Sequence, residues 1–372
     1  MRKVAILAAF ALAATTTLVA IPATAAAPNT KDSVARKLRG KLAVPADIRV
    51  DVHVLRGDDT KGVFGSAVLP SSGKEYPRGW LFLHKDGQTA FEGEPAFVAM
   101  ARNAAVLNPE EKNVFTTAAI ASTDWRTALR LPYAVGQSWS YTGGPHPLSG
   151  TIRSSIDLAG GDGRVLAAGG GLAYTMCGSG KGWLRVIHNR GLSTDYYHLS
   201  GNIAANGTPV QEGSFLGNIG TDVSCGGWAS GKHVHFSLLR DGAYVAIDRY
   251  SFGKWSIRAN ANNYDGYAMH GSTRVNVNGR LYNYGALGLN QGIVDTDGGT
   301  LLNRRSGPGS SYRVIGTVRD GDTVTIVCSK AGTTHTGRGG YSTTLWNKLS
   351  DNSWVSDAYI WTGTGHPVAG YC

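Results

Sequence analysis

Short apolar segments separated by glycine-rich turns fill the middle of this 372-residue chain. Leu172–Met176, Trp183–His188 and Val234–Leu239 are three of them. Regular short strands with turn signals between them are typical of an antiparallel sheet or barrel. Glycine contributes 51 residues, about twice its usual share, which favours a turn-rich fold. We therefore predict a mainly β protein built around an antiparallel β-sheet.

The first residues have the pattern of an export signal. Arg2 and Lys3 precede an apolar run from Val4 to Ala20, and the small residues of Ala23–Ala25 follow as a cleavage site. The run is short and rich in alanine, which disfavours the alternative of a membrane anchor. We predict that residues 1–25 are a signal peptide and that the protein is secreted, with no stable membrane association.

Residues 26–125 differ from the glycine-rich middle of the chain and contain no cysteine. They combine alternating apolar segments, typical of strands, with segments of helical periodicity. The expected elements are a helix over Asn29–Leu42, strands over Ile48–Leu55, Phe64–Leu69 and Gly79–Leu83, and a helix over Pro95–Leu107. We interpret 26–125 as a small α+β prodomain that is removed later. A permanent accessory domain is the alternative.

Two further units follow. Residues 126–270 hold the short apolar segments and form the central domain. Residues 260–290 are rich in Asn, Gly and Tyr and scarcely periodic, so we expect a loop-rich tail that runs into a linker over 271–290. Residues 291–372 restart the strand pattern, with a hairpin that enters Thr323–Cys328, and suit a small barrel.

Four cysteines accompany this export signal, and secreted proteins form disulfides. Three connectivities are open to Cys177, Cys225, Cys328 and Cys372. Pairing within each region is favoured, because each pair brackets one structural unit. No C-x-x-C spacing is present, which argues against a zinc ion held by cysteines.

The chain carries a net charge of +10. A basic exported protein is drawn to polyanionic surfaces such as bacterial envelopes. The basic residues are scattered singly instead of forming a stripe, so we expect no nucleic acid as a partner.

His233 and His235 are separated by one residue in an apolar segment that reads as a strand. Strand side chains alternate between faces, so both imidazoles point the same way, roughly 7 Å apart. Neutral histidine is a common metal ligand near pH 7. The pair is therefore a candidate edge of a metal site, against the alternative of two surface histidines.

Other polar residues between Tyr141 and Phe236 strengthen the metal-site interpretation. His146 lies in a proline-bounded turn, Asp157 in a strand-like apolar run, and His198 inside another strand. A catalytic zinc takes three nitrogen or oxygen ligands and keeps one position open for water. His146, Asp157 and one of the two strand histidines would supply them.

The remaining histidines can act on the water and on the developing oxyanion. Each of these residues alone could have a structural role. The interpretation as a metal site rests on their occurring together in one segment. We assign His188 a structural role at the end of a strand. No H-E-x-x-H helix is present, which excludes a zinc site with the glutamate base of that motif.

The order of these motifs resembles the lysostaphin-type (M23) metallopeptidases, and is most similar to the β-lytic and LasA-like branch, which is exported with a prodomain. The resemblance covers about residues 125–270. It is carried by Gly143-Gly144-Pro145-His146, Ser154-Ser155-Ile156-Asp157, Tyr196-Tyr197-His198-Leu199 and Gly231-Lys232-His233-Val234-His235-Phe236.

The resemblance implies a ligand set. The family pattern, carried onto this chain, places zinc on His146, Asp157 and His235, with His198 and His233 beside the metal-bound water. We expect His233 to be the base and His198 to orient the water or stabilise the oxyanion.

The family also implies further features. A tyrosine near the oxyanion is expected, for which Tyr141 and Tyr244 are candidates. A disulfide between Cys177 and Cys225 matches the β-lytic branch. The implied fold is an antiparallel sheet whose groove is closed by loops, and the implied activity is endopeptidase cleavage of peptidoglycan peptides, often at glycine-containing bonds.

The last unit, 291–372, resembles a bacterial SH3 domain. The resemblance rests on Leu302–Gly309, Val314–Gly316 and the Trp354-Val355 pair. Such modules usually bind cell-wall peptides and hold a hydrolase near its insoluble substrate. A purely structural β-barrel is the alternative.

We therefore expect a secreted, monomeric zinc endopeptidase that hydrolyses bacterial peptidoglycan and is made as a proenzyme. One alternative is a broader secreted protease acting on glycine-rich proteins. Another is a non-catalytic protein that binds the cell wall.

Overall fold

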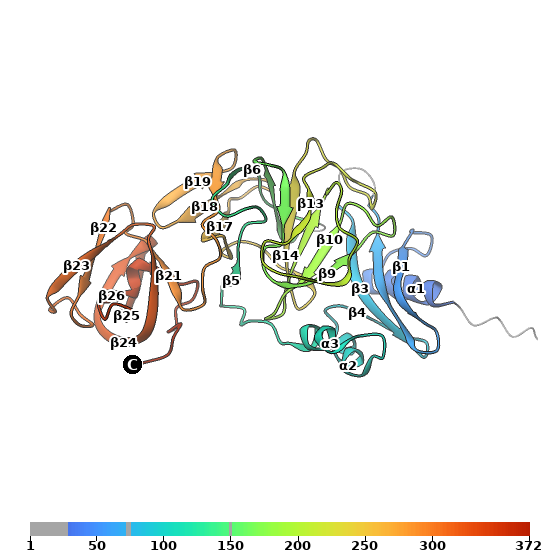
Figure 1. The fold of residues 1–372 in the computed structure, drawn as a ribbon, viewed down its shortest axis with the longest axis horizontal. Helices are drawn as coiled ribbons and strands as arrows, with labels where there is room; N and C mark the ends of the chain where they lie inside the picture. The colour runs from blue at the N-terminus through green and yellow to red at the C-terminus, as the bar shows by residue number, and fades with distance from the viewer. Residues whose placement is uncertain (1–28, 72–75, 149–150) are drawn as a thin grey trace, which may run out of the picture.

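The computed structural model describes residues 29–71, 76–148 and 151–372. The predicted signal peptide lies outside the described residues. Figure 1 shows three parts in a row: an N-terminal domain in blue to teal, a central domain in green to light orange, and a C-terminal domain in orange to red. Strands dominate the central and C-terminal domains, and the N-terminal domain combines strands with helices, so the chain as a whole confirms the predicted mainly β class. Across the described ranges, the helices are too short or too polar to cross a membrane.

The N-terminal domain is a four-stranded antiparallel sheet with helices packed on it. The side chain of Asn29 accepts a hydrogen bond from the amide of Asp32 and thereby caps the first helix. That helix buries Val34 and Leu38 against the sheet. The elements are α1 (Thr30–Leu42), β1 (Asp51–Asp58), β2 (Gly62–Leu69), β3 (Arg78–Lys85), β4 (Gln88–Phe91), α2 (Pro95–Asn103) and α3 (Pro109–Thr116).

The predicted helix over Pro95–Leu107 is wrong at its end, because α2 stops at Asn103 and a second helix follows. Asn108 and Glu111 form a capping box that starts α3: the Asn108 side chain accepts from the Glu111 amide, and the Glu111 carboxylate accepts from the Asn108 amide. The predicted helix thus keeps its start and loses its last four residues, and α3 is an additional helix that the sequence pattern did not predict.

The central domain is built on a nine-stranded sheet whose pairings are all antiparallel. Its order is β12-β9-β10-β11-β14-β7-β6-β20, with β15 paired to β14. The strands are β6 (Ser138–His146), β7 (Ser155–Ala159), β9 (Gly171–Thr175), β10 (Leu184–Ile187), β11 (Leu192–Tyr197), β12 (Asn206–Val210), β14 (Val234–Arg240), β15 (Ala243–Tyr244) and β20 (Arg280–Tyr282). A separate pair joins β8 (Arg164–Leu166) to β13 (Phe215–Asn218).

A five-stranded sheet of order β19-β18-β17-β16-β5 stands beside it. Its members are β5 (Arg126–Leu129), β16 (Ser251–Phe252), β17 (Trp255–Ala259), β18 (Gly266–His270) and β19 (Thr273–Asn276). The pairing of β16 with β5 is parallel, and the others are antiparallel.

The expectation of a loop-rich tail and a linker over 260–290 is therefore wrong for much of that segment. β18 and β19 form a hairpin through Gly271, whose φ of +57° suits glycine in a tight turn. β20 pairs with β6 and extends the main sheet, and its Leu281 is fully buried. Except for the buried His270, the polar residues of these strands are at least partly exposed, which hid the strand pattern.

The C-terminal domain is a curled, half-closed barrel of seven strands, consistent with an SH3-like fold. Its order is β23-β22-β26-β25-β24-β21-β27, and a small apolar core includes Val294, Ile326 and Val355. The strands are β21 (Gln291–Val294), β22 (Leu301–Arg305), β23 (Val314–Arg319), β24 (Thr323–Gly337), β25 (Tyr341–Leu349), β26 (Trp354–Ser356) and β27 (Ile360–Trp361), with short 3₁₀ turns at Arg338–Gly340 and Asp357–Tyr359.

Both disulfides join cysteines of the same region, as predicted. Cys177 is bonded to Cys225 in the central domain, and Cys328 to Cys372 in the C-terminal domain.

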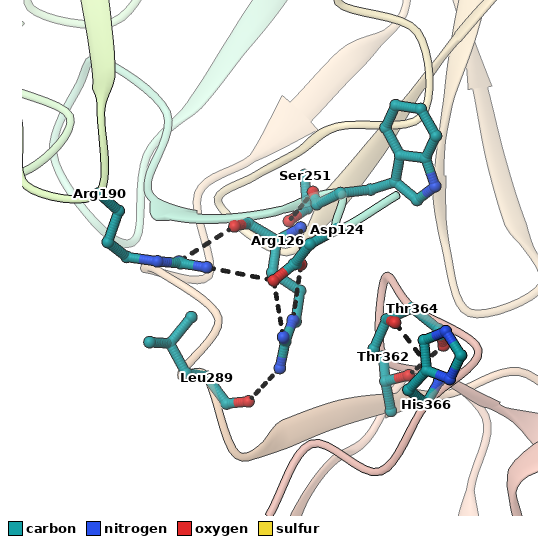
Figure 2. A network of polar contacts seen from close by, with 9 residues as sticks. Asp124, Arg126, Arg190, Ser251, Leu289, Thr362, Thr364 and His366 are labelled. Carbon is teal, nitrogen blue, oxygen red and sulfur yellow. Dashed lines mark hydrogen bonds and ion pairs between the residues drawn. The ribbon is translucent and has the colours of Figure 1, made fainter. Parts of the chain in front are cut away.

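An ion-pair network holds the start of the central domain (Figure 2). The Asp124 carboxylate accepts from the Arg126 guanidinium at 2.7 Å and from that of Arg190 at 3.2 Å. Arg126 also donates to the Leu289 carbonyl at 2.8 Å, just before the C-terminal domain. The network fixes the chain immediately after its connection to the N-terminal domain.

The N-terminal domain lies against one face of the central sheet, where β3 approaches β9 and β10 (Figure 1). The two domains share a single apolar cluster, in which Phe64 and Leu81 of the N-terminal domain pack with Tyr174, Met176 and Trp183 of the central domain. This packing brings Tyr76, two residues before β3, to the histidines of the central sheet.

Candidate metal centre

Three neighbouring strands bring the predicted ligands together. In the pairing of β14 with β7, His235 lies opposite Asp157. In the pairing of β7 with β6, Asp157 lies opposite Gly143, and His146 ends β6 opposite Ser155. Because paired residues share a face of the sheet, the side chains of His146, Asp157 and His235 converge.

The three ligand atoms form a compact triangle. His146 Nε2 lies 3.1 Å from His235 Nδ1 and 3.5 Å from Asp157 Oδ1, and His235 Nδ1 lies 3.2 Å from the same oxygen. Two ligands of a tetrahedral zinc, each at 2.0–2.1 Å, are about 3.3 Å apart. The three residues are buried, and their donor set and spacing fit a zinc ion.

Surrounding groups orient the ligands. His146 Nδ1 is 2.7 Å from the Gly144 carbonyl, so it carries the proton and leaves Nε2 free for a metal. A Cβ on Gly143 would lie 2.6 Å from Asp157 Oδ2, so the carboxylate needs glycine at this position. Tyr264 stacks on the His146 ring with centroids 4.0 Å apart.

His198 and His233 lie beside this triangle. The Nδ1 atoms of His198 and His233 are each 2.8 Å from a backbone carbonyl, those of Asp222 and Gly231. Their Nε2 atoms are buried and have no hydrogen-bond partner among the described residues. His233 Nε2 is 3.6 Å from Asp157 Oδ1. The ring centroids of His198 and His233 are 4.8 Å apart. Two proton-accepting nitrogens are thus held free next to the candidate metal site.

Burial keeps the imidazoles of His146, His198 and His235 neutral. It lowers the pKa of His146 to about 4, although the nearby Asp157 charge opposes the shift. Burial, with added repulsion from His235 and His233, lowers the pKa of His198 to about 3. Burial also places the pKa of His235 well below its usual value. At neutral pH their free nitrogens therefore offer lone pairs, as a metal ligand or a base requires.

The two candidate oxyanion tyrosines differ in position. The hydroxyl of Tyr141 is buried without a hydrogen-bond partner in the described part of the chain. Burial raises its pKa, and the charge of Asp157 adds to the shift. Tyr141 therefore remains a candidate close to the ligands.

The prediction for Tyr244 is wrong. Its hydroxyl donates to the Asp195 carboxylate at 2.6 Å and lies 3.1 Å from the Arg185 guanidinium. Tyr244 pairs with Leu239 on β14, four residues from His235 and hence about 13 Å along the strand. The buried ion pair, and not the metal site, holds this tyrosine.

His188 also lies outside the cluster. Its Nδ1 is 2.9 Å from the Gly170 carbonyl and its Nε2 is 2.8 Å from the Thr194 hydroxyl. Both ring nitrogens are satisfied, as in a structural histidine.

Two aromatic residues of the site carry no sequence signal that predicts them. Tyr264 comes from the Asn-rich segment that was interpreted as a loop. Tyr76 comes from the loop before β3, and its ring centroid is 4.5 Å from that of His235 and 5.7 Å from that of His198. The hydroxyls of Tyr76 and Tyr264 are hydrogen-bonded to each other. Neither tyrosine belongs to a periodic pattern, since each reaches the site through a turn.

Known proteins resemble the central part of the chain. Residues 151–247 match the family model described as Peptidase family M23. This segment contains Asp157, His198, His233 and His235, and His146 lies just before it.

Protease LasA of Pseudomonas aeruginosa is 33% identical over 147 residues, which are 37% of this chain and 35% of LasA. The chain thus matches about a third of that relative's length. The beta-lytic metalloendopeptidase of Lysobacter enzymogenes is 29% identical over 174 residues, 42% of this chain and 93% of that protein. Among solved structures, the deep-sea M23 metalloprotease pseudoalterin is 32% identical with a TM-score of 0.38, over 41% of this chain and 97% of that one.

Proposed function

Because the central domain of this chain belongs to peptidase family M23, we propose that the protein is a secreted zinc metalloendopeptidase that hydrolyses peptide bonds of bacterial peptidoglycan. The N-terminal domain is its prodomain, and the C-terminal domain is its wall-binding module.

One observation carries the proposal. The ligand atoms of His146, Asp157 and His235 are spaced as a tetrahedral metal requires, and the free Nε2 atoms of His198 and His233 adjoin them. Buried polar atoms without partners are costly and are retained where they have a function. Three ligands leave a fourth position for water, which is the arrangement of catalytic rather than structural zinc.

When bound at this site, zinc would lower the pKa of a water ligand and polarise the scissile carbonyl. The histidines supply the proton transfers. His233 Nε2, next to Asp157, accepts the proton of the attacking water and later donates it to the leaving amine. His198 Nε2, held by its Nδ1 bond to the Asp222 carbonyl, orients the water and faces the developing oxyanion.

Charge and architecture support a wall substrate. The net charge of +10 favours binding to an anionic envelope. A small barrel at residues 291–372, separate from the site, suits a module that keeps the enzyme on an insoluble polymer. Two disulfides and the signal-like N-terminus support secretion.

The test is incubation of the zinc-loaded chain, processed to remove the N-terminal domain, with purified cell walls and with a soluble glycine-rich protein. Mass spectrometry of the released fragments should show new amino groups on wall peptides, and His233→Ala should release none. Cleavage of the glycine-rich protein alone would replace the wall substrate by a broader protease activity. Binding to walls without cleavage of either substrate would favour the alternative of a non-catalytic protein that binds the cell wall.

A further inference from the structure

The face of the central sheet formed by β9 and β10 is covered by the N-terminal domain. Trp183, Tyr174 and Met176 have no exposed surface, because residues of β2, β3 and the helices pack on them. Gly79 of β3 lies so close to Trp183 that a Cβ there would be 2.8 Å from the indole ring. The fit between the two surfaces has the closeness of a protein core.

A buried ion pair crosses the same surface. Arg185 of β10 is fully buried and binds the Asp195 carboxylate at 2.7 Å within its own domain. Its Nη1 donates to Glu92 of the N-terminal domain at 2.7 Å, and its Nη2 donates to the Gly79 carbonyl at 3.2 Å. Buried charges of this kind are tolerated only when they are paired.

Further hydrogen bonds join the domains, and two of them come from buried hydroxyls. The hydroxyl of Tyr174 donates to Glu111 of α3 at 2.9 Å, and the hydroxyl of Ser66 on β2 donates to the Met176 carbonyl at 2.7 Å. Both lie within the apolar contact and fix its register.

This contact positions Tyr76 at the candidate metal site. Gly79 is fixed against Trp183 and Arg185, and Tyr76 lies three residues before it in the chain. The Tyr76 ring is 7% exposed and lies over His235. Its hydroxyl bonds that of Tyr264, whose ring covers His146. The two tyrosines together close the approach to the ligand triangle.

The covalent connection is separate from all these contacts. α3 ends at Thr116, and Ala121, Ser122 and Thr123 are exposed in a turn before Asp124. The Asp124 network then holds the start of the central domain (Figure 2). A cut at residues 121–123 would therefore leave both sides of the contact intact.

We propose that the face of β9 and β10 is a docking surface for this chain's own N-terminal domain, which stays bound after the connection is cut and keeps Tyr76 over the metal site as an inhibitor. The inference rests on the proposed function. Cleavage alone therefore leaves the site closed, and activity requires the N-terminal domain to leave.

The experiment uses the full chain with the recognition sequence of a site-specific protease inserted between Ser122 and Thr123. After cutting, we expect the two fragments to co-elute in gel filtration. Fragments that separate at micromolar concentration would overturn the docking surface.

Glu92→Gln should weaken the association at least about thirtyfold, because it removes the partner of a buried charge. Glu94→Gln is the matched control, since Glu94 pairs with Lys41 inside the N-terminal domain. Equal association of both variants would contradict a docking surface centred on Arg185.

A second measurement tests Tyr76 independently. In the cut, associated, zinc-loaded chain, Tyr76→Ala should raise the rate at which a chelator removes zinc several-fold without separating the fragments. An unchanged rate would overturn the inhibitory role of Tyr76. Neither elution nor zinc removal depends on turnover, so an enzyme that cuts no wall would defeat the proposed function and leave these results standing.

Discussion

His146 Nε2 and His235 Nδ1 lie 3.1 Å apart and share Asp157 Oδ1 as a neighbour. The proton of His146 is on the opposite ring nitrogen, at the Gly144 carbonyl, so its lone pair points into this triangle. A cation at its centre satisfies all three groups at once.

The first prediction separates ligands from proton carriers. His146→Ala and Asp157→Ala should each weaken zinc binding by more than about a hundredfold. Loss of a residue that only orients a ligand costs about 10–100-fold in metal affinity, and loss of a ligand itself should cost more. His198→Ala should keep zinc, and its turnover rate should fall about 10²–10⁴-fold. Metal analysis after dialysis, together with peptide cleavage, measures both; a His198→Ala variant that comes out free of zinc would reverse its assigned role.

The second prediction concerns space beside Asp157. Gly143→Ala should weaken zinc binding, because the added Cβ would lie 2.6 Å from Asp157 Oδ2 and displace the carboxylate. Gly231→Ala is the matched control, since a Cβ there meets no atom within 4 Å although Gly231 lies only two residues before His233. Zinc titration of both variants should show a loss for Gly143→Ala alone. Equal affinities would mean that the carboxylate adapts.

The third prediction is a pH dependence of stability. Burial lowers the pKa of His188 to about 4, whereas an unfolded histidine takes up its proton near pH 6.5. Between these values the unfolded state binds more protons, so the free energy of unfolding falls as pH is lowered from about 6.5 towards 4, by about 3 kcal/mol from this residue. The contribution is fully present above pH 6.5.

Urea unfolding of the metal-free protein at several pH values measures this slope. His188→Gln should flatten it, whereas the same substitution at the exposed His366 should leave it unchanged. Parallel slopes for the original chain and His188→Gln would contradict the assignment.

The fourth prediction concerns the C-terminal domain. Deleting residues 291–372 keeps Leu289, whose carbonyl binds Arg126, and removes the barrel. Binding to whole walls should weaken, whereas cleavage of a short soluble peptide should persist. Sedimentation with walls and a peptide assay give the two readouts, and equal loss of both would make the barrel part of the catalytic fold.

The sequence predicts the central sheet well because its strands are buried and apolar. Val234 and Phe236 alternate with His235, so the strand and the common face of its two histidines follow from local pattern. The helix α3 was missed although Asn108, Pro109 and Glu111 form a readable capping signal. β20 offers only Leu281 as a buried residue, too little for a periodic pattern.

The roles of Tyr76 and Tyr264 at the site could not be predicted from the local sequence pattern, for a different reason. Each reaches the site through tertiary packing, Tyr76 from another domain, so no spacing near either residue marks it. The sequence also predicted a role at the metal site for Tyr244, which the structure does not support. Its hydroxyl is bound by the buried Arg185 instead.

The apolar cluster shared by the N-terminal and central domains has a consequence for where the protein would act. In the intact chain the two surfaces meet at the high effective concentration of a tethered pair. After a cut, their association follows mass action and weakens as the protein is diluted. If the protein is exported and the bound N-terminal domain inhibits it, as proposed, molecules crowded at the exporting surface would stay inactive and would become active as they diffuse away.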